Sequence, residues 1–223
     1  MSDGYFVSIL GLLTPAVIET IYMVVVAAVM AYVIGLPLGI LLVVSSGGNI
    51  LPNPWIERVL GTIINILRSA PFIVLMVALI PFTRLVVGTS IGTSAAIVPL
   101  VIAAAPFVAR IVESSLKEVP HGVIEAAQSM GASPFQIIRK VLLPEAKSSL
   151  VLGAAITVIN VIGYTAMAGA VGGGGLGDLA IQYGYNRFRT DIMIITVAVL
   201  VIFVQAVQTF GTKLAVKAMH SKR

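Results

Sequence analysis

Five stretches of this chain are long, apolar and almost free of charged residues. A transmembrane helix needs about 20 consecutive, mostly apolar residues, and each stretch reaches that length. Because 58% of the residues are hydrophobic and only 10% are charged, the chain has too little polar surface for a soluble globule. We therefore predict an all-α, polytopic membrane protein with about five transmembrane helices and the lipid bilayer as its solvent. The predicted spans are residues 17–44, 59–80, 91–112, 150–171 and 192–216.

A polar, helix-prone stretch, residues 121–144, separates the third predicted span from the fourth, and we call it the elbow segment. Good helix formers fill its beginning, Gly131 suits the end of a helix, and the Ser-Pro pair at 133–134 suits the start of another. We predict a helix-turn-helix outside the membrane. Its small residues, Ala126 and Ala127, would let the surface of another protein approach the backbone closely. The alternative is a plain solvated loop.

The lysines and arginines indicate which way the chain crosses the membrane. If the elbow segment is cytoplasmic, ten of the 14 basic residues face inside, three face outside and one lies within a span. The positive-inside rule then places the N-terminus outside and the C-terminus in the cytoplasm. We accordingly expect residues 1–16 to form an external segment and residues 212–223 to form a cytoplasmic basic tail. The outside set is Arg84, Arg187 and Arg189, and the residue within a span is Arg68.

The fourth predicted span carries polar side chains that could line a path through the membrane. Asn160, Tyr164 and Thr165 interrupt an otherwise apolar helix, and polar groups inside a membrane either find partners or line a route. Met167 follows near the outer end, where a flexible thioether could close a gap and move aside as a gate. The alternative for Met167 is an ordinary methionine that faces lipid or the protein core.

Arg68 lies near the middle of the second predicted span, where an unpaired guanidinium costs roughly a few kcal/mol or more. It stands shortly before Pro71, which disrupts a helix. In one interpretation Arg68 faces a water-filled cavity and belongs to the pathway. In the other, residues 59–67 lie along the cytoplasmic interface and Arg68 snorkels there. We prefer the cavity.

The sequence argues against chemistry on this chain. No Walker A motif is present, and the glycine-rich run at 172–177 lacks the preceding strand of a nucleotide site, so the sequence offers no ATP-binding site of this kind. We expect that run to be a flexible outer hinge. With no cysteine and two histidines, no metal-binding or catalytic set emerges. The basic residues that give the net charge of +5 are scattered, which argues against nucleic-acid binding. Glu19 stands alone in the first span, and Glu113 with Lys117 is expected to be a solvated i, i+4 pair.

The elbow segment also resembles a known motif. Glu125-Ala126-Ala127, followed by Gly131 and by Val141-Leu142-Leu143-Pro144, is similar to the EAA loop of the membrane subunits of ATP-binding-cassette (ABC) importers. That loop often has Ile where this chain has Val141. Further stretches resemble the methionine-type permeases among these importers, so that the resemblance covers most of the chain from about residue 15 to 211. These stretches are residues 68–72, 80–84, 105–110 and 163–177.

This resemblance implies that residues 17–211 form an ABC-type transmembrane domain. The elbow segment would be its coupling loop, a cytoplasmic coupling helix that docks on an ATPase. The chain would then be no enzyme, and ATP with Mg²⁺ would belong to two cytoplasmic ABC ATPase subunits. An extracytoplasmic methionine-binding lipoprotein would deliver D- or L-methionine or an analogue to the permease, which would move it across the inner or plasma membrane. The residues that the resemblance assigns to coupling are Glu125, Ala126, Ala127, Gly131 and Pro144.

Five spans make a thin wall for a solute-sized path, which favours a homodimer. Alternating access, driven through the two coupling loops, would then move the solute. One alternative is a permease for another amino acid or small solute. An ion-coupled secondary carrier is another, and it predicts charged in-span residues and an inverted repeat. A scaffold subunit without a path is the third.

Overall fold

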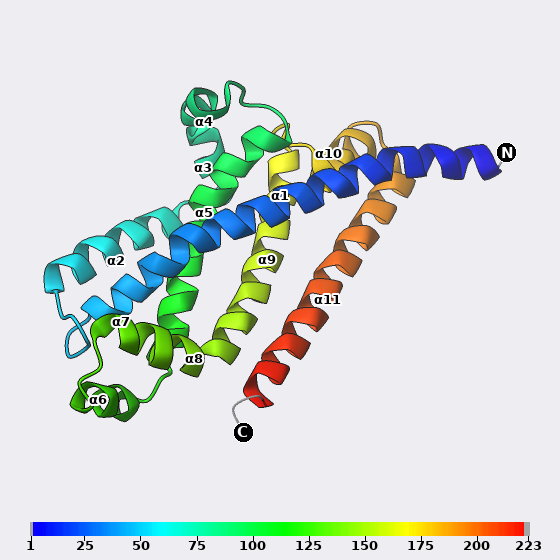
Figure 1. The fold of residues 1–223 in the computed structure, drawn as a ribbon. Coiled ribbons are helices and arrows are strands. Elements are labelled where there is room, and N and C mark those ends of the chain that lie inside the picture. The colour runs from blue at the N-terminus through cyan, green and yellow to red at the C-terminus, as the bar shows by residue number, and fades with distance from the viewer. Residues whose placement is uncertain (1, 221–223) are drawn as a thin grey trace. The chain divides into compact units, whose positions relative to one another are not determined.

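The computed structural model describes residues 2–220, which form helices joined by short connections and contain no strand. Figure 1 shows four long helices, α1 (Ser2–Ser45), α5 (Thr93–Lys117), α9 (Lys147–Gly169) and α11 (Thr190–His220). The predicted all-α class is confirmed. The shorter helices are α2 (Pro54–Ser69), α3 (Phe72–Ala78), α4 (Ile80–Val87), α6 (His121–Ser129), α7 (Pro134–Ile137), η1 (Ile138–Leu142), α8 (Leu143–Glu145), α10 (Gly175–Leu179) and η2 (Ala180–Tyr185), where η marks a π-helical turn.

Length and hydropathy identify the helices that could cross a membrane. Within residues 2–220, four helices pass this test by themselves, and the broken pair α2 and α3 would raise the number to five. The prediction of a polytopic protein with about five spans is therefore confirmed. The four continuous candidates are Val7–Ser45, Thr93–Lys117, Lys147–Gly169 and Thr190–Met219.

The first and last helices are longer than the predicted spans. α1 is helical from Ser2 and its candidate span begins at Val7, because apolar residues continue the helical pattern upstream of residue 17. Most of the expected external segment 1–16 is thus the beginning of α1. α11 extends to His220, since the lysines and alanines of the basic tail are good helix formers. Residues 221–223 lie outside the described part of the chain.

The second predicted span, residues 59–80, is not one continuous helix. α2 ends at Ser69 and α3 begins at Phe72. Pro71 is extended, with φ −59° and ψ 133°, because proline lacks the N–H that a helix interior needs and its ring clashes with the preceding turn. Arg68 therefore sits in the last turn of α2, at a helix end, and not in the middle of a continuous helix.

The chain divides into two compact units, each assembled from separate stretches of sequence. The first comprises the residues up to 30 together with 70–103 and 158–208. The second comprises residues 31–69, 104–157 and those from 209 onward. The four long helices contribute to both units.

In the first unit, α10 and the beginning of α11 pack against the beginning of α1. Their buried cluster consists of Ala16, Leu176, Leu179 and Ile192. At the edge of this cluster the Tyr5 hydroxyl donates a 2.5 Å hydrogen bond to the Asp191 carboxylate. That hydrogen bond raises the pKa of Tyr5 above its ordinary value.

In the second unit, α1 and α5 approach each other through glycines. A Cβ added at Gly35 would lie 2.6 Å from the Ala105 carbonyl oxygen, and one added at Gly39 would lie 2.6 Å from the Ala109 carbonyl oxygen. Small residues spaced by four allow this close contact between helices in a membrane. Nearby, Leu42 of α1, Ile64 of α2 and Ala109 of α5 form a buried cluster. These contacts hold three helices together.

Candidate functional site

In the elbow segment a tight turn joins α6 to α7, and η1 and the beginning of α8 follow α7 directly. α6 ends in a Schellman motif, in which the Gly131 N–H donates to the Gln128 carbonyl (2.9 Å) and the Ala132 N–H donates to the Ala127 carbonyl (3.1 Å). Gly131 has a φ of +75°, a left-handed conformation that costs an L-residue with a Cβ roughly 1–2 kcal/mol. A Cβ at this position would meet nothing within 4 Å. The turn thus requires glycine for its backbone conformation and not for lack of space.

A capping box starts the second helix of the elbow segment. The Gln136 N–H donates to the Ser133 hydroxyl at 3.4 Å, and the Ser133 N–H donates to the side-chain oxygen of Gln136 at 2.9 Å. Pro134 occupies the first turn, where its missing N–H has no cost. The predicted helix-turn-helix is confirmed, and the alternative of a plain solvated loop is wrong.

The residues assigned to coupling lie on the surface of the elbow segment. Glu125, Ala126, Gly131 and Pro144 are exposed and Ala127 is half-buried. One buried side chain, Ile124, attaches α6 to the rest of its unit. The structure therefore brings the small-residue face to the surface. Its contact with an ATPase stays a prediction.

Two large apolar side chains beside the turn were not singled out from the sequence. Met130 is 87% exposed and Phe135 is 68% exposed, on either side of Gly131. Large side chains of this kind supply much of the binding energy when a partner covers them. The available signal was their position, since both interrupt a polar stretch expected outside the membrane.

His121 fixes the beginning of α6 to a neighbouring loop. Its Nε2 lies 3.0 Å from the Gly48 carbonyl oxygen, to which it donates because a carbonyl can only accept. Its Nδ1 lies 3.2 Å from a Glu125 carboxylate oxygen. The ring thereby joins the turn between α1 and α2 to the helix that carries the small-residue face.

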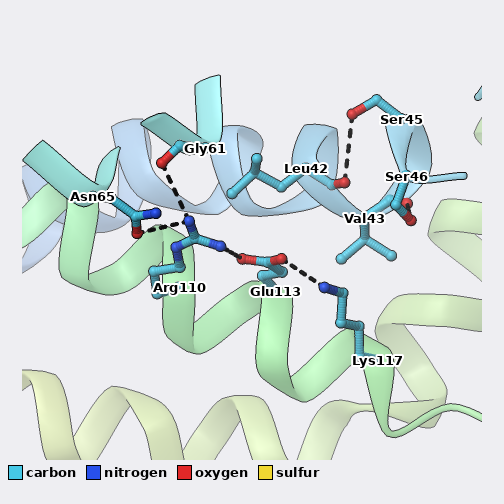
Figure 2. A network of polar contacts seen from close by, with 9 residues as sticks. All are labelled: Leu42, Val43, Ser45, Ser46, Gly61, Asn65, Arg110, Glu113 and Lys117. Atoms are coloured by element: carbon cyan, nitrogen blue, oxygen red, sulfur yellow. Dashed lines mark hydrogen bonds and ion pairs between the residues drawn. The ribbon is translucent and has the colours of Figure 1, made fainter. Parts of the chain in front are cut away.

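A network of polar contacts connects α2 to α5 in the same unit (Figure 2). The Arg110 guanidinium donates to the Asn65 side-chain oxygen at 2.8 Å and to the Gly61 carbonyl at 3.2 Å. It also forms an ion pair with Glu113 at 2.5 Å, and Lys117 Nζ lies 2.7 Å from the other oxygen of the same carboxylate. The Glu113 carboxylate thus pairs with two cations of its own helix, Arg110 and Lys117. Arg110 also donates hydrogen bonds to the neighbouring helix α2.

This network corrects the prediction for Glu113 and Lys117. The i, i+4 pair exists, but Glu113 is only 8% exposed, so it is not a solvated surface pair. The sequence did not reveal the second cation. Arg110 is three residues from Glu113 and was used for topology and as part of a family-like stretch, but its contacts with α2 join residues 45 and 49 positions apart.

On α9, three of the four predicted pathway residues share one face. Asn160, Tyr164 and Met167 recur at the spacing of one helix face, and Met167 is 48% exposed. The Tyr164 ring stacks on Phe72 of α3, with centroids 4.5 Å apart and an interplanar angle of 11°. This face combines an amide, a stacked aromatic pair and a flexible thioether.

Thr165 and Arg68 do not join that face. Thr165 is 1% exposed and its hydroxyl donates to the Ile162 carbonyl of its own helix at 2.8 Å, which is a common way to satisfy a buried threonine. Arg68 is exposed in the last turn of α2 and belongs to the other compact unit. Thr165, two residues before Met167, therefore points to another side of α9.

The glycine-rich run at 172–177 is a packed element and not a flexible hinge. Gly173, Gly175 and Gly177 are buried. The Gly175 N–H donates to the Glu19 carboxylate at 2.7 Å, which attaches the run to α1. Glycine was interpreted as a source of flexibility, but here it allows backbone segments to approach closely.

Residues 2–220 contain no group of three or more His, Cys, Asp or Glu side chains that could hold a metal ion. The ion pairs described above lie within α5 and α6, and hydrogen bonds from Arg110 join α5 to α2. Two surface features remain as candidates for a function. They are the elbow segment and the α9 face that carries Asn160, Tyr164 and Met167.

A family model described as binding-protein-dependent transport system inner membrane component matches residues 35–212. A Vibrio cholerae protein named probable D-methionine transport system permease protein MetI is 53% identical over 209 residues, which cover 94% of this chain and 93% of that protein. The Escherichia coli K12 D-methionine transport system permease protein MetI is 55% identical over 158 residues, covering 71% and 73% of the two chains.

Solved structures agree with this match. A chain from inward-facing conformations of the MetNI methionine ABC transporter superposes with a TM-score of 0.93 at 50% identity, and the match covers 95% of this chain and 98% of that one. A chain from an amino acid ABC transporter crystallised with histidines has a TM-score of 0.79 at 20% identity, covering 96% and 97%. The second likeness concerns the fold alone.

Proposed function

This chain belongs to the family of binding-protein-dependent transport system inner membrane components, and we propose that it is the permease subunit of an ATP-driven methionine importer. The observation that carries the proposal is the nearly end-to-end match, at 53% identity, to a protein named as a D-methionine transport permease. The likeness to a chain of a methionine ABC transporter, with a TM-score of 0.93, supports the same substrate. D-methionine, L-methionine and close analogues are the candidate solutes.

In this proposal the elbow segment transmits the ATPase cycle to the membrane helices. Its exposed helix-turn-helix presents small residues, Ala126 and Ala127, beside two exposed apolar side chains, Met130 and Phe135. A groove on an ATPase could admit the small face and cover the apolar pair. Glu125 and Pro144, both exposed, would lie at the edges of this contact. ATP and Mg²⁺ would be bound by the ATPase subunits, and the chain itself would catalyse no reaction.

The permease would act as a homodimer that contacts two ATPase subunits in the cytoplasm and a binding protein outside. This assembly gives each coupling loop one ATPase and builds a path from two sets of spans. The basic residues favour an external N-terminus and a cytoplasmic C-terminus. The membrane would be the inner or plasma membrane.

The path would run along the α9 face that carries Asn160, Tyr164 and Met167, with Met167 as the gate. The half-exposed thioether can fill a gap and then move aside, and its exposure of 48% leaves it free to contact a second copy of the chain. Thr165, on the buried side of α9, would stabilise the helix through its hydrogen bond to the Ile162 carbonyl. Arg68, at the exposed end of α2, suits a cytoplasmic interface better than the interior of a span.

Uptake of labelled amino acids by cells that lack and then regain this chain, with its ATPase and binding protein present, tests the function. We expect ATP-dependent accumulation of methionine that unlabelled D- and L-methionine suppress, while histidine and other unrelated amino acids do not. Restored uptake of a different amino acid would overturn the substrate assignment. Accumulation that follows an ion gradient without the ATPase would favour the secondary carrier.

A further inference from the structure

Two neighbouring side chains of α1 hold the glycine-rich segment, residues 172–177, by its backbone. The Glu19 carboxylate accepts the Gly175 N–H at 2.7 Å, and the Thr20 hydroxyl accepts the Leu176 N–H at 2.9 Å. Thr20 is 1% exposed and donates in turn to the Ala16 carbonyl at 2.9 Å. Both polar groups thus have partners in a helix that is mostly apolar, where an ionisable side chain is costly.

The other side of the segment lies against the last turn of α9 at distances that only glycine permits. A Cβ added at Gly177 would lie 2.3 Å from the Ala166 carbonyl oxygen. The Gly173 N–H donates to the Ala168 carbonyl at 2.9 Å. These contacts hold the residues directly before and after Met167. The segment therefore connects α1 to both chain neighbours of the proposed gate.

A third contact limits how the segment can move. The Gly92 N–H, just before α5, donates to the Gly172 carbonyl at 2.8 Å. The segment is thus fixed at its beginning by Gly92 and near its end by Glu19 and Thr20. All of these residues belong to one compact unit.

We propose that Glu19 and Thr20 are positioning residues that set the closed placement of Met167 by holding the glycine-rich segment against the last turn of α9. This inference rests on the proposed role of Met167 as the gate. A side chain that merely stabilised the fold could be lost without a specific effect at position 167. A positioning residue, when lost, frees the last turn of α9 and opens the route at that position.

Because the chain has no cysteine, Met167→Cys gives the permease subunit one reporter thiol, whose labelling is read on that subunit after the subunits are separated. In the complete transporter complex in lipid vesicles without ATP, the rate at which a membrane-impermeant thiol reagent labels this cysteine measures its accessibility. Because a hydrogen bond contributes about 1 kcal/mol, we expect Thr20→Val and Glu19→Leu each to raise the labelling rate about fivefold. Thr20→Ser should restore the original rate, since it retains the hydroxyl.

A matched control is available on the same helix. Thr14 donates its hydroxyl to the Leu10 carbonyl at 2.8 Å and is exposed, so Thr14→Val removes a comparable hydroxyl away from the glycine-rich segment. It should leave labelling unchanged. If Thr20→Val does not assemble, the labelling rate of Glu19→Gln tests the proposal instead. This change keeps the side-chain shape at a half-buried position and weakens only the charge-assisted hydrogen bond, so we expect faster labelling.

The functional readout is the number of ATP molecules hydrolysed per methionine transported, measured with Met167 intact. We expect this ratio to rise in Thr20→Val and Glu19→Leu together with the labelling rate. An assembled variant with unchanged labelling, or with faster labelling and an unchanged ratio, overturns the positioning role. Failure of the wild-type complex to import methionine would instead refute the proposed function, while the labelling comparison would still report whether these residues place position 167.

Discussion

The Arg110 guanidinium and the Glu113 carboxylate lie 2.5 Å apart on α5, and Arg110 reaches across to α2 from the same position. Removing one partner from a buried ion pair leaves an uncompensated charge, which costs more than the pair itself contributes. Glu113 therefore determines whether Arg110 can remain between the two helices. The consequence can be measured in the permease alone.

We predict that Glu113→Ala destabilises the permease by about 3 kcal/mol, because Arg110 and Lys117 lose their shared carboxylate. A lower midpoint of thermal unfolding in detergent would report the loss. Glu113→Gln should have a smaller effect, since its amide oxygen can still accept one hydrogen bond. Glu118→Gln is the matched control, because Glu118 is exposed on the neighbouring connection. Equal midpoints for Glu113→Ala and Glu118→Gln would contradict the structural role of the network.

Met130→Ser and Phe135→Ser should weaken binding of the ATPase without altering the stability of the permease. Burial of a large apolar side chain contributes about 1.5–3 kcal/mol, so each change should lower the affinity by roughly 10- to 100-fold. Titration of the ATPase onto permease in nanodiscs measures this. Leu85→Ser serves as the control, because Leu85 is 86% exposed on α4, away from the elbow segment in sequence. An unchanged affinity in both elbow variants would place the ATPase contact elsewhere.

Replacements of Gly131 test two roles of this residue separately, its left-handed backbone conformation and its predicted contact with the ATPase. Gly131→Ala should lower the stability of the turn by about 1 kcal/mol, and Gly131→Asn should cost less because asparagine tolerates the left-handed conformation. Gly131→Trp should leave the protein inserted but uncouple ATP hydrolysis from uptake. Gly122→Ala is the control, since the added Cβ meets nothing within 4 Å and Gly122 lacks a positive φ. Wild-type transport by Gly131→Trp would exclude Gly131 from the coupling contact.

Met167→Ala should raise basal ATP hydrolysis or allow solute to leak, while the transporter complex still assembles. The truncated side chain would lack the flexible thioether that the proposed gate requires. ATPase assays and dye-release assays on reconstituted vesicles measure both effects. Met30→Ala provides a comparison, because Met30 is 45% exposed on α1. Unchanged hydrolysis together with tight vesicles would remove Met167 from the gate.

The sequence was sufficient to predict those elements of the fold that depend on local signals. The elbow helices follow from Gly131, Ser133 and Pro134, whose effects act within a few residues. The all-α class follows from the length of the apolar stretches, because a bilayer permits few other solutions. Pro71 signalled the end of α2. The predicted span 59–80 missed this break because hydropathy averaged over a window does not register a single proline.

Contacts between distant residues could not be predicted in this way. The burial of Glu113 depends on α2 and α5 packing together, which no i, i+4 pattern encodes. Glycines at 172–177 are compatible with either a hinge or a close backbone contact, and only tertiary packing distinguishes the two. The separation of Thr165 from Asn160 and Met167 was available from helix geometry and was overlooked, because polarity alone was used to group them.

We propose that an ATPase acting through the elbow segment drives methionine through this permease. Purified permease in sealed vesicles, with and without its ATPase, gives the decisive measurement when labelled methionine and the binding protein are outside and ATP is inside. We expect accumulation only when both subunits and ATP are present, and its loss in Gly131→Trp. Equal accumulation without the ATPase would show that the ATPase does not drive transport.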